Sequence, residues 1–293
     1  MTEPTQDPKT AEAQPPFDEQ KQPAPGMETQ MDQKPDHGEK TYRGNGKMTG
    51  RAAIITGADS GIGRAVAIAF AREGADILIS HLCEDADAQE TARLVEEAGR
   101  RAVVVAGDIG EQAHCQSLVD RAMSEFGRLD VLVNNAAHQK PIQHIRDFPA
   151  EEWDKTFKTN IYSMFYLSKA AAAQMKPGSA IVNSCSVEAK DPDAMLLAYA
   201  TTKGAIVTFT KSLAKMLVKD GIRVNAVAPG PVWTPLVISG MPQEDIKTFG
   251  KESPMGRPAQ PGELAPVYVL LAAGEASYCN GEIYSVAGGS YPV

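Results

Sequence analysis

The feature that most constrains the fold is a regular alternation of short aliphatic runs with longer stretches of helical periodicity. The runs are uninterrupted rather than alternating with polar residues, which is typical of strands buried on both faces. A series of strand and helix predicts an α/β, doubly wound parallel sheet with right-handed crossovers. The seven predicted strands span 52–56, 76–80, 102–105, 129–133, 180–182, 223–227 and 282–286. The predicted helices between them span 64–72, 86–98, 112–126, 151–175 and 196–219.

The first 45 residues have a different character. They are rich in Pro, Gln, Glu, Asp and Lys, and Phe17 and Tyr42 are among the few large apolar side chains. Such a segment buries too little apolar surface to offset its ordering entropy, so we predict an extended or disordered arm over 1–45. An alternative is an arm that lies along the folded body or a neighbouring subunit, held by Phe17 and Tyr42. The single folded domain would then occupy residues 46–293.

Charge and cysteine usage exclude several classes of function. The 293 residues carry a net charge of −8 and a pI near 5.2, which disfavours nucleic-acid and anionic-membrane partners. No run approaches the ~18 apolar residues of a membrane span, and the first residues lack the pattern of a secretory signal. The four cysteines are scattered without a Cys-x-x-Cys pair, which predicts free thiols in the cytoplasm. The histidines and carboxylates show no metal-ligand spacing, so no metal is expected.

A glycine-rich turn follows the first strand, with the sequence Thr56-Gly57-Ala58-Asp59-Ser60-Gly61-Ile62-Gly63. Between a strand and a helix, such glycines permit a tight turn and let backbone N–H groups approach a pyrophosphate. Its position in the first strand–turn–helix unit favours a dinucleotide-binding, Rossmann-type fold over an ordinary loop.

Together with later motifs, this spacing resembles the short-chain dehydrogenase/reductase family from Met48 to the end of the chain. The forepart resembles a bacterial subgroup with N-terminal extensions, described as general-stress or glucose/ribitol-dehydrogenase-like. The other positions that carry the resemblance are Asp108, Asn134-Asn135-Ala136, Asn160, Ser186, Tyr199-x-x-x-Lys203 and Pro229-Gly230.

The resemblance implies a catalytic set of Asn160, Ser186, Tyr199 and Lys203. Tyr199 and Lys203 are four residues apart on one predicted helix face, and an adjacent ammonium is expected to lower the pKa of the phenol. Tyr199 would then be a general acid/base. Ser186 would hold the substrate oxygen, with Ser184 as a competitor, and Asn160 would hold a water that relays protons toward Lys203. A packed tyrosine beside a solvated lysine is the alternative for the pair.

The predicted cofactor site surrounds the glycine turn and the ends of the other strands. At the end of the second strand, an acidic residue binds the ribose 2′-hydroxyl of NAD and a basic residue binds the 2′-phosphate of NADP. His81 and Leu82 stand there, so neither the expected Asp nor an Arg is present, and Glu84 and Asp85 follow. Arg64 is either a cation near this end or a solvated surface residue. NAD is therefore favoured, and His81 leaves NADP open. The predicted cofactor-binding residues are Gly57, Asp59, Ser60, Gly61, Ile62, Gly63, His81, Asp108, Ile109, Asn135, Ala136, Ala137, Tyr199, Lys203, Pro229, Gly230, Val232 and Thr234.

Two positions depart from the family pattern, because Ala137 and Ala287 stand where relatives commonly have Gly and Asp. The predicted substrate pocket is mainly apolar with an acidic group, and Trp233 and Met241 are either pocket or packing residues. Its predicted members are Val187, Glu188, Met195, Val232, Trp233, Thr234, Leu236, Val237, Ile238, Met241 and Phe249.

The predicted function is hydride transfer between a nicotinamide cofactor and a small alcohol or carbonyl substrate. Two alternatives are a non-catalytic dinucleotide sensor or stress protein and a nucleotide-sugar epimerase or dehydratase. The resemblance further implies a homotetramer that assembles through the two long helices and the C-terminal segment.

Overall fold

Seven strands form one parallel sheet in the computed structural model, which describes residues 6–290. The strand order is β3-β2-β1-β4-β5-β6-β7, and every neighbouring pair runs parallel. This confirms the predicted doubly wound, Rossmann-type fold. Residues 1–5 of the predicted arm and 291–293 of the predicted domain lie outside the described part. The strands are β1 Ala52–Thr56, β2 Asp76–His81, β3 Ala102–Ala106, β4 Val131–Asn134, β5 Ala180–Ser184, β6 Arg223–Pro229 and β7 Ile283–Val286.

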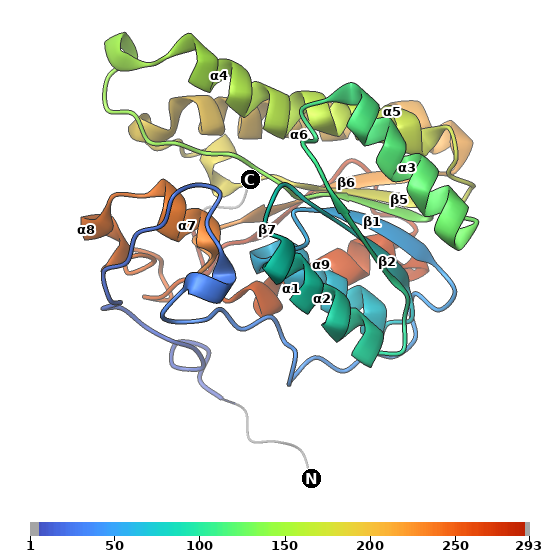
Figure 1. Ribbon diagram of the computed structural model, residues 1–293, viewed down its shortest axis with the longest axis horizontal. Coiled ribbons are helices and arrows are strands. Elements are labelled where there is room, and N and C mark those ends of the chain that lie inside the picture. Colours follow the sequence, from blue (N-terminus) through green and yellow to red (C-terminus); the bar gives the residue numbers. More distant parts are fainter. Residues whose placement is uncertain (1–5, 291–293) are drawn as a thin grey trace.

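Helices cover both faces of the sheet (Figure 1). Because side chains alternate along a strand, Ala53 and Ile55 of β1 join one buried cluster and Ile54 joins the other. The first cluster includes residues of α1, α2 and α9, and the second includes residues of α3, α5 and α6. The helices are α1 Gly61–Arg72, α2 Asp85–Glu97, α3 Gln112–Phe126, α4 Ala150–Phe157, α5 Ser163–Ala172, α6 Leu197–Leu217, α7 Pro235–Gly240, α8 Gln243–Ile246 and α9 Pro261–Ala272.

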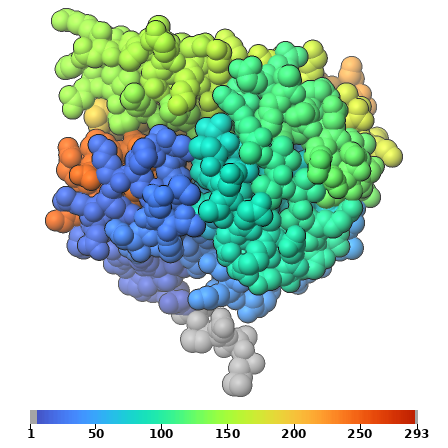
Figure 2. All heavy atoms as spheres, in the orientation of Figure 1, coloured from blue at the N-terminus to red at the C-terminus, as the bar shows by residue number. Residues whose placement is uncertain are grey.

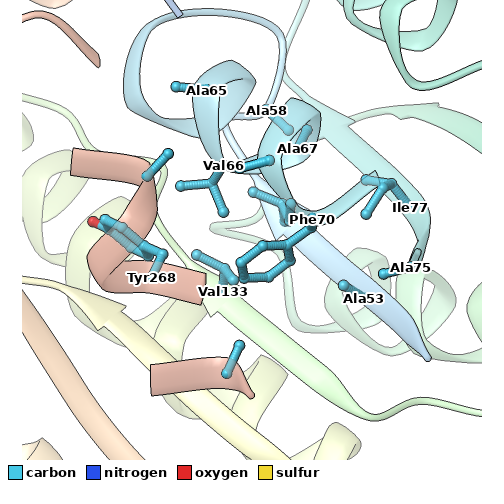
Figure 3. Close-up of a cluster of buried hydrophobic side chains, with 14 of the residues drawn as sticks. Ala53, Ala58, Ala65, Val66, Ala67, Phe70, Ala75, Ile77, Val133 and Tyr268 are labelled. Carbon is cyan, nitrogen blue, oxygen red and sulfur yellow. The ribbon is translucent and has the colours of Figure 1, made fainter. Parts of the chain in front are cut away.

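The first cluster depends on small residues in α1. Alanines let this helix approach the sheet closely, and Phe70 is the largest side chain that α1 adds to the cluster. Figure 3 shows Val66 and Phe70 facing Val133 of β4 and Tyr268 of α9. The close packing fixes the start of α1, and with it the glycine turn.

The structure divides one predicted helix and adds three that were not predicted, the short α7 and α8 and the longer α9. The helix predicted over 151–175 is divided into α4 and α5 by a π-helical turn, Lys158–Tyr162, in which the N–H of Ser163 bonds the carbonyl of Lys158. Helix α9 was not predicted, because Pro261 and Pro266 resemble helix breakers. Pro261 stands at the tolerated first position, Pro266 lies on the exposed side with Glu263 and Leu270, and the opposite, apolar side packs against α1.

The arm packs on the folded body, in agreement with the alternative prediction for this segment. Residues 6–45 have little regular structure apart from one short turn, Glu28–Gln30. Phe17 is buried and stacks on Trp233 with ring centroids 4.2 Å apart. The Tyr42 hydroxyl donates to Glu73 over 2.7 Å. In Figure 2 the blue surface of the arm lies beside the orange surface that includes α7 and α8.

The topology determines where a ligand can bind. The chain leaves β1 toward β2 on one side and β4 lies on the other, so a crevice opens between the carboxyl ends of β1 and β4. Among residues 6–290, no helix combines the length and apolarity needed to cross a membrane.

Candidate active site

A cavity of about 650 Å³ lies at the carboxyl ends of the strands. This volume is within the range of sites that hold cofactor-sized ligands. All the predicted catalytic and cofactor-binding residues line it except Gly63 and Asn160. The structure thus gathers residues from widely separated stretches of sequence around one space.

The glycine turn is tied to the end of β4 through Thr56 and Asn135. The Thr56 Oγ1 accepts the backbone N–H groups of Asn135 at 2.9 Å and Ala136 at 3.1 Å. The Asn135 side chain donates back to the carbonyls of Thr56 and Gly57. A Cβ on Gly57, whose φ is +61°, would lie 3.0 Å from the Cα of Ala136. Two backbone segments therefore meet at a glycine, which leaves the turn open toward the cavity.

Gly63 does not line the cavity, and its role is packing. A Cβ at this position would lie 1.9 Å from the carbonyl oxygen of Gly57, so α1 could not begin where it does with any other residue. Gly61 lines the cavity with φ +51° at the first position of α1. The backbone of the turn faces the cavity beside a helix N-terminus, as in pyrophosphate sites, and the N–H of Gly61 itself is bonded to the Glu28 carboxylate.

The end of the cavity near β2 is acidic. Asp59 is buried, and its burial together with the nearby Glu84 raises the pKa of its carboxyl to about 6. Ser60 donates to Asp59 over 2.8 Å, and the Nε2 of the buried His81 bonds Asp85 over 2.7 Å. The lysine and arginine residues that line the cavity within the described chain are Lys155 and Lys203, which belong to α4 and α6.

Arg64 is not a solvated surface cation. Its side chain is buried beneath the glycine turn and donates to the Asp59 carbonyl, to Thr91 and to the Asp87 carbonyl. Arg64 therefore stabilises the turn through the Asp59 carbonyl and does not line the cavity.

The catalytic candidates meet where β5 ends and α6 begins. The Ser186 side chain is near enough to Tyr199 to act on the pKa of the phenol, and its Oγ accepts the N–H of Glu188 at 3.2 Å. The Nζ of Lys203 lies 5.1 Å from the centroid of the Tyr199 ring and donates to the Ser184 carbonyl over 2.8 Å. The Ser184 hydroxyl bonds Asn135 and Tyr268 instead of Tyr199, so Ser186 is the serine at the phenol.

Burial is the largest influence on the Tyr199–Lys203 pair. It raises the pKa of Tyr199 above its ordinary value and lowers the pKa of Lys203 to about 8. The expected lowering of the Tyr199 pKa by Lys203 is therefore wrong for this arrangement, because desolvation exceeds any effect of an ammonium 5.1 Å from the ring centroid. The protein holds Tyr199 as a protonated phenol, the form that donates a proton.

Asn160 is buried within the π-helical turn and does not line the cavity. Its side chain pairs with both backbone groups of His138 and donates to the Thr202 hydroxyl at 3.0 Å. It therefore joins the loop after β4 to α6, next to Lys203. A water relay through Asn160 stays a prediction.

The substrate end of the cavity differs in part from the prediction. Val187, Glu188, Val232, Thr234, Leu236, Val237, Met241 and Phe249 line it, whereas Met195, Trp233 and Ile238 do not. Trp233 is fully buried between Phe17 and Phe249 and donates its indole N–H to the Gln33 carbonyl. It is a packing residue under the cavity wall.

Sequence reasoning missed several lining residues, among them His138, Gln139 and Asp193. His138 and Gln139 directly follow Ala137, and their closeness to the Asn-Asn-Ala motif was an available signal. His138 is hydrogen-bonded to Glu152 of α4, a partner that sequence spacing does not reveal. Of residues 6–290, no three His, Cys, Asp or Glu side chains gather as a metal site would require.

A glycine turn suited to a dinucleotide and a buried tyrosine–lysine pair in one crevice define a dinucleotide-dependent oxidoreductase. Comparison with known proteins agrees. Residues 57–291 match the family model described as enoyl-(acyl carrier protein) reductase. The chain belongs to the short-chain dehydrogenase/reductase family, which transfers hydride between a nicotinamide cofactor and alcohol or carbonyl groups.

Three relatives illustrate the range of the family. The chain is 50% identical to the uncharacterized oxidoreductase YhdF of Bacillus subtilis, covering 91% of this chain and 92% of that protein. It is 43% identical to the glucose and ribitol dehydrogenase of Daucus carota, over 94% and 97% of the two chains. The crystal structure of a short chain dehydrogenase from Burkholderia cenocepacia in complex with NADP superposes on this chain with a TM-score of 0.78. The two sequences are 30% identical, and the match covers 83% of this chain and 98% of that one.

Proposed function

We propose that Tyr199 is the general acid/base of this oxidoreductase, with Ser186 and Lys203 as its partners. The observation that carries the proposal is that Ser186, Tyr199 and Lys203 line the same cavity, with the Lys203 Nζ 5.1 Å from the centroid of the Tyr199 ring. When bound, the nicotinamide supplies or accepts the hydride.

The chain's own residues perform the proton chemistry. In reduction, the Ser186 hydroxyl holds the carbonyl oxygen and stabilises the charge that develops there. Tyr199, which is protonated near neutral pH, donates its proton to that oxygen. Lys203, whose pKa of about 8 lets it exchange protons near neutrality, lies beside the ring to restore the proton. Oxidation reverses these steps.

The test is turnover with a panel of alcohols, aldehydes and ketones and with both nicotinamide cofactors. We expect hydride transfer with at least one substrate. Dinucleotide binding without turnover across the panel would instead favour the sensor alternative.

We propose NAD as the preferred cofactor. The support is that Asp59 and Glu84 line the cavity next to the end of β2, whereas the two lining lysines, Lys155 and Lys203, come from α4 and α6. A ribose hydroxyl suits carboxylates, whereas a 2′-phosphate needs a cation. The Burkholderia relative binds NADP, so the decisive measurement is the ratio of kcat/KM for NADH and NADPH. A ratio below one would overturn the preference.

We propose a small polyhydroxylated alcohol or the matching aldehyde as substrate. Glu188, Gln139 and His138 provide polar groups beside the apolar side chains of the cavity. The name of the Daucus carota relative, a glucose and ribitol dehydrogenase, supports the same class. Turnover of simple apolar ketones at equal or higher kcat/KM than sugars and polyols would contradict it.

We also propose a homotetramer located in the cytoplasm. Trp153 of α4, Tyr162 of the π-helical turn and Phe165 of α5 are exposed large apolar side chains on one continuous helical stretch, which suits an interface between subunits. All four cysteines are free thiols, as expected in a reducing compartment. Sedimentation velocity tests the assembly.

A further inference from the structure

A segment of the N-terminal arm forms part of the cavity wall. Ala24, Pro25 and Gly26 line the same space as the glycine turn. The Pro25 carbonyl accepts the Ser239 hydroxyl of α7 at 3.2 Å. The arm therefore passes between the turn that fits a pyrophosphate and the helix beside the substrate end.

Glu28 follows this wall segment and reaches the start of α1. The residue is 2% exposed, and its Oε2 accepts the Gly61 N–H at 3.0 Å and bonds His37 at 2.9 Å. Its other oxygen is paired with Arg64. One carboxylate from the arm is thus buried at the N-terminus of the cofactor helix.

The environment keeps Glu28 ionised. Burial by itself would raise the pKa of the carboxyl, but the His37 hydrogen bond, the Arg64 cation and the Gly61 N–H outweigh it and lower the pKa. A carboxylate at this position also interacts favourably with the helix dipole.

The Glu28–Arg64 pair connects the arm to the glycine turn. Arg64 donates to the Asp59 carbonyl, in the middle of that turn, from Nε at 2.9 Å and from Nη2 at 2.6 Å. Asp87 of α2, fully buried, accepts the backbone N–H groups of Glu28 and Thr29 at 2.6 and 3.0 Å. The arm is therefore anchored on two sides of the turn.

We propose that the arm is a component of the dinucleotide site, and that Glu28 is a positioning residue that holds the glycine turn and the 24–26 wall in the binding conformation. The inference rests on the proposed dinucleotide site. Loss of Glu28 would leave the buried Arg64 cation without this partner, and Arg64 is the side chain that holds the Asp59 carbonyl of the turn.

The experiment measures the Kd of NADH and of ADP-ribose for the full chain and for Glu28→Ala and Glu28→Gln. ADP-ribose contains the pyrophosphate and adenosine but lacks the nicotinamide. We expect Glu28→Ala to raise both Kd values at least tenfold. Glu28→Gln, which keeps an oxygen for Gly61 but loses the charge, should give an intermediate increase. In turnover assays, the KM for the cofactor should rise by a larger factor than kcat falls.

Glu19→Ala is the matched control, because Glu19 is an exposed acidic residue of the same arm. It should bind both ligands as the unchanged protein does. Kd values for both Glu28 variants within twofold of the unchanged protein, or tighter binding, would overturn the inference. If Glu28→Ala does not fold, Glu28→Gln decides in the same way. Failure of the unchanged protein to bind either ligand would instead overturn the proposed site itself.

Discussion

The two ends of the cavity are built in different ways. The end that fits a pyrophosphate consists of backbone: Gly57 and Gly61 at positive φ, and a helix start that Gly63 allows. The catalytic end consists of side chains whose protonation is governed by burial, above all Tyr199 and Lys203. Substitutions at the backbone end should therefore alter shape and binding, whereas substitutions at the catalytic end should alter proton transfer.

The largest expected effect is at the catalytic end. Tyr199→Phe removes the proton donor but keeps the ring, so kcat should fall by roughly 10³-fold, within the usual range for a lost general acid. The Kd of NADH, measured by fluorescence titration, should change less than threefold. Retained turnover would contradict the role of Tyr199, and lost binding would break the separation between the two ends.

At the backbone end, Gly63→Ala should destabilise the fold. Its methyl group would meet the Gly57 carbonyl at 1.9 Å, so backbone must move, at a cost of about 3 kcal/mol. Cofactor binding should weaken with it. The measurement is the free energy of unfolding in urea.

Gly204→Ala is the matched control, since nothing beyond its own helix lies within 4 Å of the place that an added methyl group would take. Here the free energy of unfolding should rise by roughly 0.5–1 kcal/mol, because alanine favours a helix interior. Equal destabilisation by both substitutions would contradict the packing argument.

The pH dependence of stability tests the burial of Lys203. Its pKa is about 8 in the folded protein and 10.5 ordinarily, so between these values the unfolded chain binds more protons. Stability should therefore rise with pH across this window and lose that contribution as pH falls toward 8. Relative to Lys203→Met, the unchanged protein should gain about 2 kcal/mol of unfolding free energy from pH 8 to pH 10. If the unfolding free energies of the two proteins changed equally between pH 8 and pH 10, the lowered pKa of Lys203 would be contradicted.

The smallest expected effect is spectroscopic and lies in the arm. Phe17→Ala removes the ring stacked on Trp233, so the buried indole should become partly hydrated. In a Trp153→Phe background, the emission maximum should move to longer wavelength. An unchanged spectrum would mean that the arm does not cover Trp233 in solution.

The difference between the two ends also explains what sequence could predict. The glycine turn and the seven strands were predictable because each reflects a local steric or burial requirement. The raised pKa of Tyr199 was not, since desolvation depends on segments far away in the chain. Helix α9 was missed because its prolines suggest a break that tertiary packing overrides. Glu28 could not be predicted, because in the sequence it looks like any solvated acidic residue of a polar arm. Only the fold brings it into contact with Arg64 and Gly61.

The most direct test of the proposed chemistry follows the hydride itself. The unchanged protein is incubated with NADH dideuterated at the nicotinamide C4 and the aldehyde turned over fastest in the panel, and the product alcohol is analysed by mass spectrometry. We expect one carbon-bound deuterium in each product molecule, with product formation almost lost in Tyr199→Phe. A product without deuterium, or one formed equally well by Tyr199→Phe, would contradict hydride transfer with Tyr199 as the proton donor.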